Sequence, residues 1–407
     1  CFEGKIDEFA VYDRELTQDE ITRMYNTYYS PNRVANGNFS QIGNEEVTNG
    51  DFSQIGSEEI TNGDFATDSD WIKQTGWTIS GGSANYDDAV STSNVYISNS
   101  ISLLSAKQYK LTFEVNNTSS TGQILFQASG GGVDNLNSYT EYTTGTHTIY
   151  FNVTANRSSL KIFGRDGYGN FSIDNVSVKE VAQDWSVLGN LSFDNNKATF
   201  AGGGIIQYIV QNNVFTQNKF YKYTFDVVRT SGKIKPLYGI GGSSIVGASP
   251  DIDATGTYTI TFKNTSNGEK LFFYSGATEN FVGSITNITV KEVGQHWTFN
   301  TGWSTDGTKA TSDGTATNLT QNLSFNTNAT YKVMFDITDY TSGAVRITLN
   351  DVNTADVNAV GSYSYDLTIG SSITTGKILI DPRSNFVGSI DNIVVQELKH
   401  DATNLML

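Results

Sequence analysis

The sequence predicts an all-β protein: three tandem antiparallel β-sandwich modules, with one short helix near the N-terminus. Three observations support this fold class. A block of roughly 110 residues occurs three times, its apolar residues alternate with polar ones, and turn signals separate the resulting strands. At 407 residues, the chain is also too long for one ordinary domain.

One aromatic strand identifies the repeated block. Tyr109-Lys110-Leu111-Thr112-Phe113-Glu114-Val115 recurs at Tyr221–Val227 and at Tyr331–Ile337. Each copy also begins with a bulky pair and ends on a shared motif. The pairs are Trp71/Trp77, Trp185/Leu191 and Trp297/Trp303, and the closing motifs lie at Phe171–Glu180, Val282–Glu292 and Val387–Glu397. We therefore expect Tyr109, Tyr221 and Tyr331 to occupy one structural position.

Within each copy the apolar period is two, as in a strand with one buried face. The odd-numbered residues of Tyr109–Val115 should face the core and the even-numbered ones the solvent. Gly81-Gly82, Thr255-Gly256 and Ser342-Gly343 are turn signals expected to break the strands, and only four prolines are present to interrupt them. A jelly roll is the natural candidate for such a sandwich.

These patterns predict a division of the chain into module 1 (62–181), module 2 (182–293), module 3 (294–398) and a tail or linker (399–407). Residues 32–61 hold a shorter repeat with a period of 13, whose units begin at Asn36, Asn49 and Asn62. So few short units cannot form a domain. They are either a linker that docks on its neighbours or redundant copies of the next module's first strand.

Residues 1–31 predict one short strand around Ile6, Phe9 and Val11, followed by a helix that starts at Thr17. Thr17 and Glu20 form a capping box, and Ile21, Met24 and Tyr25 then share one helix face. One strand and one helix cannot bury a core. The strand should therefore pair with another part of the protein or with a neighbouring subunit.

Composition excludes several function classes. A net charge of −16 argues against nucleic acid, and the apolar runs are too short for membrane insertion. No signal peptide opens the chain. Cys1, the single cysteine, excludes an intrachain disulfide framework and stands where a natural chain would show Met, so we expect the sequence to be a window from a longer protein.

We expect no enzymatic activity. The three histidines, His147, His296 and His400, form no spaced pair, and no nucleophile, zinc-protease or phosphate-loop motif is present. The acid that recurs in all three copies (Glu114, Asp226, Asp336) alternates with core residues and is interpreted as part of a polar face.

The tryptophan pairs allow two interpretations. A spacing of six would keep both rings on one side of a strand, where they could stack on sugars, or the rings could fill the core. Leu191 replaces the second ring in copy two, which favours the core. The candidate ligand-binding residues are instead Arg165, Tyr168, Tyr274 and Arg383, with Asp166, in loops just before the final strands. Those loops would also vary if nothing constrained them.

The copies resemble a known group. The order N-G-D-F, W, Y-x-L-x-F-x-V and I-D-N-V-x-V is similar to the jelly-roll carbohydrate-binding modules of bacterial glycanases, and to copies in marine phage tail and fibre proteins. The junctions at Lys179–Trp185 and Lys291–Trp297 match the phage style. Gly4, Ile6, Asp7, Glu8 and Tyr12 resemble the C-terminal edge of a laminin-G-like, concanavalin-type jelly roll.

The resemblance implies a structural Ca²⁺ between the first and last strands of a module, held by oxygen ligands. In module 1 the ligands would be Asn62, Gly63, Asp64 and Asp174. Copy two has Thr286 in place of the acid, and copy three begins with Gln295-His296. The alternative is that Asp174 and Asp391 only cap a strand turn.

The resemblance also implies a structural and adhesive protein of a virion surface, of the phage tail-fibre type, located on the virion or outside the cell. Its partners would be cell-surface glycans, other virion proteins or further copies of itself. The alternative is a secreted bacterial adhesin, or the accessory carbohydrate-binding region of a polysaccharide-degrading enzyme.

Overall fold

The computed structural model describes residues 14–22, 29–91, 93–105, 107–116, 122–240, 244–248, 251–265, 267 and 269–399. The predicted N-terminal strand and the motif from Gly4 to Tyr12 lie outside the described residues. The capping box is confirmed, because the Glu20 N–H donates to Thr17 Oγ1 (3.3 Å) and the Thr17 N–H to Glu20 Oε2 (3.0 Å). A helical turn follows at 18–22. Within the described residues, no helix is long and apolar enough to span a membrane.

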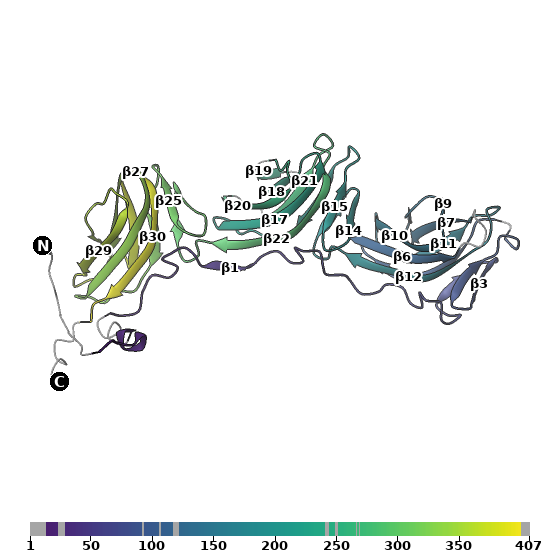
Figure 1. Ribbon diagram of the computed structural model, residues 1–407, viewed down its shortest axis with the longest axis horizontal. Coiled ribbons are helices and arrows are strands. Elements are labelled where there is room, and N and C mark those ends of the chain that lie inside the picture. Colours follow the sequence, from purple (N-terminus) through teal and green to yellow (C-terminus); the bar gives the residue numbers. More distant parts are fainter. Residues whose placement is uncertain are drawn as a thin grey trace.

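The predicted all-β fold class is confirmed. The described strands form antiparallel sheets, and buried side chains gather in three separate clusters that correspond to modules 1, 2 and 3. Figure 1 shows the modules in a row, with module 3 at one end, module 2 in the middle and module 1 at the other end.

Module 1 is a sandwich of two sheets. One sheet has the order β10-β6-β12-β4-β3, and the other has the order β2-β5-β11-β7-β8, with β9 also paired to β7. The bounds are β2 (Trp71–Lys73), β3 (Trp77–Ser80), β4 (Ser83–Tyr86), β5 (Val95–Leu103), β6 (Gln108–Asn116), β7 (Gln123–Ser129), β8 (Val133–Asn135), β9 (Thr140–Glu141), β10 (Gly145–Asn152), β11 (Arg157–Gly164) and β12 (Phe171–Val181).

Module 2 repeats this arrangement with the orders β20-β17-β22-β15-β14 and β13-β16-β21-β18-β19. The bounds are β13 (Ser186–Leu188), β14 (Leu191–Phe193), β15 (Ala198–Ala201), β16 (Gln207–Gln211), β17 (Phe220–Ser231), β18 (Lys235–Ile240), β19 (Ser244–Ala248), β20 (Gly256–Lys263), β21 (Lys270–Ser275) and β22 (Val282–Val293).

In module 3 two long strands, β27 and β30, each pass through both layers, so that all its strands belong to one connected sheet. The bounds are β23 (Thr298–Phe299), β24 (Trp303–Thr305), β25 (Ala310–Asp313), β26 (Leu319–Asn322), β27 (Thr330–Leu349), β28 (Val352–Asn353), β29 (Gly361–Thr368) and β30 (Lys377–Glu397).

The repeated tyrosines do occupy one position. Tyr109, Tyr221 and Tyr331 are each the second residue of β6, β17 and β27, and all three are buried. Each hydroxyl accepts a hydrogen bond from the backbone N–H five residues earlier, at 2.8, 2.8 and 2.7 Å. The alternation predicted for Tyr109–Val115 is also confirmed, since its odd-numbered residues are buried and Glu114 is exposed.

One expectation about strand breaks is wrong. Ser342-Gly343 does not end a strand: it lies inside β27, where the pairing register with β30 shifts and the strand bends from one layer to the other. The prolines do not interrupt the strands, as expected: Pro236 and Pro382 lie inside β18 and β30, and both strands continue past them.

The tryptophan pairs fill the core, as favoured from the sequence. All six residues are buried. The expectation that a spacing of six keeps a pair on one strand is wrong, however. Trp71 lies on β2 and Trp77 on β3, and these strands belong to opposite sheets of module 1.

The N-terminal segment 29–67, which we call the strip, runs along the modules in reverse order (Figure 1). Phe39 is buried in the core of module 3, Phe52 in that of module 2 and Phe65 in that of module 1. Strand β1 (Ile42–Glu45) pairs with the end of β22 in module 2. Each 13-residue unit thus packs on a different module, and the first unit packs on the last module.

Candidate functional site

Aromatic side chains face solvent at the same register in modules 1 and 2. Tyr96 on β5 lies opposite Phe163 on β11, with ring centroids 5.0 Å apart, and Tyr208 on β16 lies opposite Tyr274 on β21. Successive strand residues point to opposite faces. The neighbours Ile97, Ile162, Ile209 and Phe273 are fully buried, so these four aromatic rings point away from the core. We call them the outer aromatic pairs.

Module 3 lacks an outer aromatic pair. Leu319 and Ile380 are its buried cross-strand pair, and the positions beside them hold Asn318 and Asp381. Asp381 accepts a hydrogen bond from Arg346 Nε at 2.8 Å, and Arg383 Nη1 lies 3.7 Å from the same carboxylate. The predicted ligand residue Arg383 therefore belongs to a charged cluster on module 3.

In module 1 the aromatic surface is flanked by cations. Lys161 Nζ lies 4.5 Å from the ring centroid of Tyr96. Arg165, two residues beyond Phe163 on the same face, packs its guanidinium over Tyr168 (4.2 Å) and Tyr139 (5.4 Å). Each such cation–π contact contributes about 0.5–1 kcal/mol at an exposed site.

The loop after β11 is fixed by Asp88. Its carboxylate accepts the backbone N–H groups of Gly167 (2.8 Å) and Gly169 (2.9 Å). Arg165 Nη1 also donates to Gln123 Oε1 at 2.7 Å. The structure thus brings the predicted residues Arg165 and Tyr168 together at the end of module 1, with Asp166 exposed beside them.

Module 2 carries the remaining predicted ligand residue, Tyr274. Phe272, two residues earlier on the same face, packs edge-on against Tyr208 with centroids 6.0 Å apart. Lys235 lies opposite Tyr274 in register and forms an ion pair with Glu279 at 2.6 Å. The four predicted ligand residues therefore do not form one site. They lie on three modules: Arg165 and Tyr168 on module 1, Tyr274 on module 2 and Arg383 on module 3.

Sequence reasoning missed Tyr96, Phe163, Tyr208 and Phe272. The signal that could have found them is an aromatic residue at an outward position of an alternating strand, as in Leu160-Lys161-Ile162-Phe163. Flat, partly apolar rings beside hydroxyls and cations can bind a ligand that is itself apolar on one face and polar at its edges. A pyranose ring has that character.

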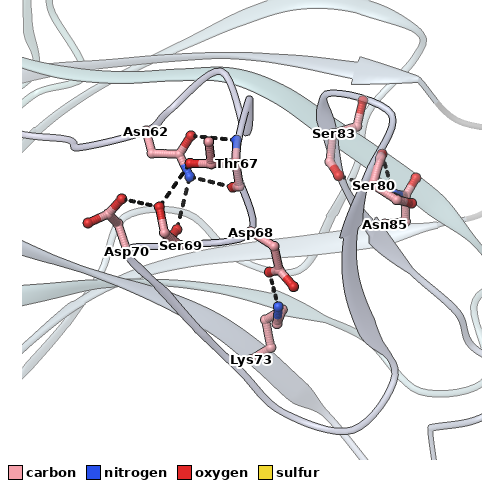
Figure 2. Close-up of polar contacts among 9 residues, drawn as sticks. All are labelled: Asn62, Thr67, Asp68, Ser69, Asp70, Lys73, Ser80, Ser83 and Asn85. Atoms are coloured by element: carbon pink, nitrogen blue, oxygen red, sulfur yellow. Dashed lines mark hydrogen bonds and ion pairs between the residues drawn. The ribbon is translucent and has the colours of Figure 1, made fainter.

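The predicted calcium ligands are already engaged. Figure 2 shows the Asn62 amide within its own turn: Nδ2 donates to the carbonyls of Thr67 (2.7 Å) and Ser69 (2.9 Å), and Oδ1 accepts from the Thr67 N–H. The Gly63 carbonyl accepts the Val176 N–H at 2.8 Å. Asp64 Oδ1 accepts from the Ala66 N–H, and Asp174 Oδ1 from the Asn175 N–H.

One electrostatic feature still favours a cation. Burial, with the negative charges of Glu114 and Asp64, raises the pKa of Asp174 above its usual value. The described residues nevertheless contain no group of three or more His, Cys, Asp or Glu side chains suited to a metal. Among the predicted ligands, only the carboxylates of Asp64 and Asp174 therefore suit a cation.

The structure corrects one part of the calcium comparison. The equivalent of Asn62-Gly63-Asp64 in module 3 is Asn36-Gly37-Asn38, not Gln295-His296, and module 2 has Asn49-Gly50-Asp51. In each module the Asn carbonyl accepts an indole N–H, from Trp71, Trp185 or Trp297. Module 1 remains the one with acids at both Asp64 and Asp174.

No protein-family model matches this chain, and no curated protein matches its sequence. Solved structures similar to it include the tandem CBM22 domain of Xyn10C from Paenibacillus barcinonensis (8% identity, TM-score 0.27, covering 59% of this chain and 98% of that chain). A fucolectin from striped bass, Morone saxatilis, is also similar (9% identity, TM-score 0.21, covering 58% of this chain and 99% of that chain). So is a triple-jelly-roll protein of an archaeal virus (13% identity, TM-score 0.21, covering 81% of this chain and 89% of that chain). At TM-scores this low the similarity does not assign a fold, and the fold class of this chain rests on its own sheet topology.

Proposed function

We propose that this protein is a non-enzymatic, structural and adhesive protein of a virion surface, of the phage tail-fibre type, which presents glycan-binding β modules. The outer aromatic pairs carry the proposal. Tyr96/Phe163 and Tyr208/Tyr274 occupy one register in two modules and leave half-buried rings facing solvent. Apolar surface held open in this way is typical of a binding site.

The chemistry of these surfaces fits a sugar. A pyranose would place its C–H face on the rings, and its hydroxyls would meet Lys161 and Arg165 on module 1 or Lys235 on module 2. Binding on an open face suits a polysaccharide chain, because a chain can cross several modules and gain affinity from multivalency.

The path of the chain suits a protein that is attached at the base of module 3 and presents modules 2 and 1 away from that point. Tyr29 and Leu398 form a bridge at the base of module 3, so the strip enters and the last strand leaves at the same place. Modules 2 and 1 extend from there in a row (Figure 1). Tyr29 and Ser30, which the sequence analysis placed in the segment 1–31, thus belong to module 3. We further propose that the part of segment 1–31 before the strip belongs to the edge of a laminin-G-like domain.

A glycan array with matched variants tests the proposal. The double variant Y96A/Y274A should lose at least about tenfold in affinity for any glycan that the wild-type chain binds, since each truncated aromatic anchor costs about 1–3 kcal/mol. N318A changes the equivalent position of module 3 and should bind like wild type. Equal binding by Y96A/Y274A and wild type, or no glycan bound by the wild-type chain, would refute glycan binding.

The virion location needs a separate measurement. Antibodies raised against module 1 should label particles at a projecting appendage in electron micrographs. Label found on secreted material or on bacterial surfaces instead would contradict a virion protein while leaving the glycan-binding result intact.

A further inference from the structure

Each unit of the strip inserts its Phe into the core of one module, beside the first Trp and the last strand of that module, and we call this place the module's groove. Several contacts of the unit recur in all three grooves. The Phe rings of the units, Phe39, Phe52 and Phe65, lie 5.4, 5.5 and 4.9 Å from the rings of Trp297, Trp185 and Trp71 respectively. Five residues before each Phe, Val34, Val47 and Ile60 are buried in the same cores. The sequence N-G-[ND]-F with an apolar residue two positions before the Asn is therefore a ligand with two anchors.

Hydrogen bonds fix the register of each unit. The carbonyls of Gly37, Gly50 and Gly63 accept the N–H groups of Ile393, Ile288 and Val176 at 2.9, 3.0 and 2.8 Å. Four residues before each unit's Asn, a side-chain oxygen accepts one more N–H from the module's last strand. These contacts are Asn32 with Val395 (2.9 Å), Glu45 with Val290 (2.6 Å) and Glu58 with Val178 (2.8 Å).

The grooves of modules 2 and 3 share one further contact with their units. Gln211 of module 2 exchanges two hydrogen bonds with the backbone of Thr48, at 3.0 and 2.9 Å. Gln321 of module 3 does the same with Ala35, at 2.8 Å each. Both grooves thus bind backbone groups of the unit and the side chains of the shared motif. These contacts give a groove little basis for preferring one unit over another.

The glycine of each unit is required by the groove. A Cβ on Gly50 would overlap the carbonyl oxygen of Ile288, and a Cβ on Gly37 would overlap that of Ile393. A Gly50→Ala change therefore abolishes the fit of a unit without altering the groove itself.

The units that begin at Asn36 and Asn49 are far in sequence from the modules on which they pack, modules 3 and 2. Asn36 is 261 residues from Trp297, and Asn49 is 136 residues from Trp185. At roughly 5–20 residues per second, synthesis of the 261-residue interval takes on the order of 13–50 s. During that time the unit exists without its groove, so a groove on another chain can capture it.

We propose that the grooves of modules 2 and 3 are interchangeable receptors for this peptide motif, and that the strip of a second copy of this chain can fill them. Such exchange conserves every contact of the closed chain, as in domain swapping. The protein can therefore assemble through its strip. This proposal is independent of glycan binding.

A labelled synthetic peptide of residues 45–56 tests the groove. The full-length Gly50→Ala chain should bind it at least tenfold more tightly than the wild-type chain, whose own unit competes at an effective concentration on the order of millimolar. The peptide carrying Gly50→Ala is the matched control and should not bind. A peptide of residues 58–69, with the unit of module 1, should bind the same chain within about tenfold of the cognate peptide.

A second variant, Phe52→Ala, keeps the test decisive if the Gly50→Ala chain does not fold. Phe52→Ala keeps the backbone of the unit and removes one anchor, and the wild-type peptide should raise its thermal unfolding midpoint. No peptide binding by folded variants, or binding of the Ala control peptide as strongly as the wild-type one, would overturn the proposal. Rejection of the 58–69 peptide would overturn interchangeability.

Exchange between whole chains is the final step of the test. Wild-type chain refolded at high micromolar concentration should yield a dimer at twice the 44.4 kDa chain mass, and its fraction should fall on refolding at low concentration. The Gly37→Ala/Gly50→Ala chain should form none. A wild-type chain that is monomeric at every concentration would contradict exchange between copies.

Discussion

Three asparagines shape the last strand of each module. Asn175, Asn287 and Asn392 adopt left-handed φ values of 49°, 52° and 52°, where the pairing register shifts. Their side chains donate to Glu114, Asp226 and Asp336 on the neighbouring strand at 2.6, 2.7 and 2.7 Å. The acid common to the three copies, interpreted from sequence as a plain polar face, is thus the partner of the bulge asparagine.

Removing one of these asparagines should destabilise its module. We expect N287A to lower the free energy of unfolding by about 1–3 kcal/mol, from a lost charge-assisted hydrogen bond and a left-handed alanine. N287G keeps the backbone conformation at no steric cost and should lose less. Urea denaturation checks this, and equal losses in both variants would mean that φ does not matter here.

The same contact predicts a dependence on pH. Hydrogen bonds from Thr257 and then Asn287 lower the pKa of Asp226. A lowered folded-state pKa stabilises the fold above the unfolded pKa of about 3.9, and this contribution disappears as the pH falls through the folded value. The difference in stability between wild type and N287G should accordingly shrink in acid. A difference that persists at the lowest pH at which both remain folded would contradict the assignment.

Asp174 is the residue at which the predicted calcium site can be tested. Because burial and like charges raise its pKa, D174N should be neutral or stabilising without calcium. With calcium, wild type should gain stability and D174N should not, since one carboxylate cannot compensate the dehydration of the ion. Thermal melting with and without Ca²⁺ measures both effects. An equal gain in D174N would reject Asp174 as a ligand, and D391N is the control in module 3.

At the scale of elements, module 3 differs from the others in the continuity of β27. Gly343 lies within this strand at φ 76°, and a Cβ there would come within 2.5 Å of the Phe386 nitrogen. Glycine is therefore what allows β27 to bend between layers without ending.

We expect G343A to destabilise the protein by about 1–3 kcal/mol, through backbone strain and the close approach to β30. G370A is the matched control, because a Cβ at Gly370 meets nothing within 4 Å. It should change stability by less than about 1 kcal/mol. Differential scanning calorimetry distinguishes the two. A G343A protein as stable as G370A would mean that the bend tolerates a side chain.

Sequence patterns predicted the elements that depend on local information. Strict alternation located β6 and its equivalents, and Thr17 with Glu20 located the capped helical turn. The bend at Ser342-Gly343 could not be predicted, since glycine marks turns and bulges alike and only the partner strand decides between them. Of the outer aromatic pairs only Tyr274 was predicted; Tyr96, Phe163 and Tyr208 were missed because an aromatic residue in a strand usually indicates core.

At the scale of the whole molecule, the strip connects the modules. Its units run from module 3 to module 1, and the chain then returns from module 1 to module 3. The period of 13 was visible in the sequence, but the assignment of each unit was not. Three nearly identical units carry no local signal that tells which groove each one fills, and the order follows from the path of the chain.

The modules also contact one another directly. Lys110 Nζ forms an ion pair with Asp194 at 2.9 Å between modules 1 and 2, and Lys263 Nζ donates to the Phe299 carbonyl at 2.9 Å between modules 2 and 3. Phe220 packs on Phe299 with ring centroids 4.8 Å apart. Residues near the start of the equivalent strands β6 and β17, Lys110 and Phe220, take part in the two junctions.

Amide hydrogen exchange on single glycine variants tests the central claim, that the units complete the modules in reverse order. We predict that G37A, near the start of the chain, increases exchange around Ile393 in module 3 and leaves module 1 protected. G50A should act around Ile288 in module 2, and G63A around Val176 in module 1. An effect of G37A confined to the strip and module 1, with Ile393 still protected, would contradict the account.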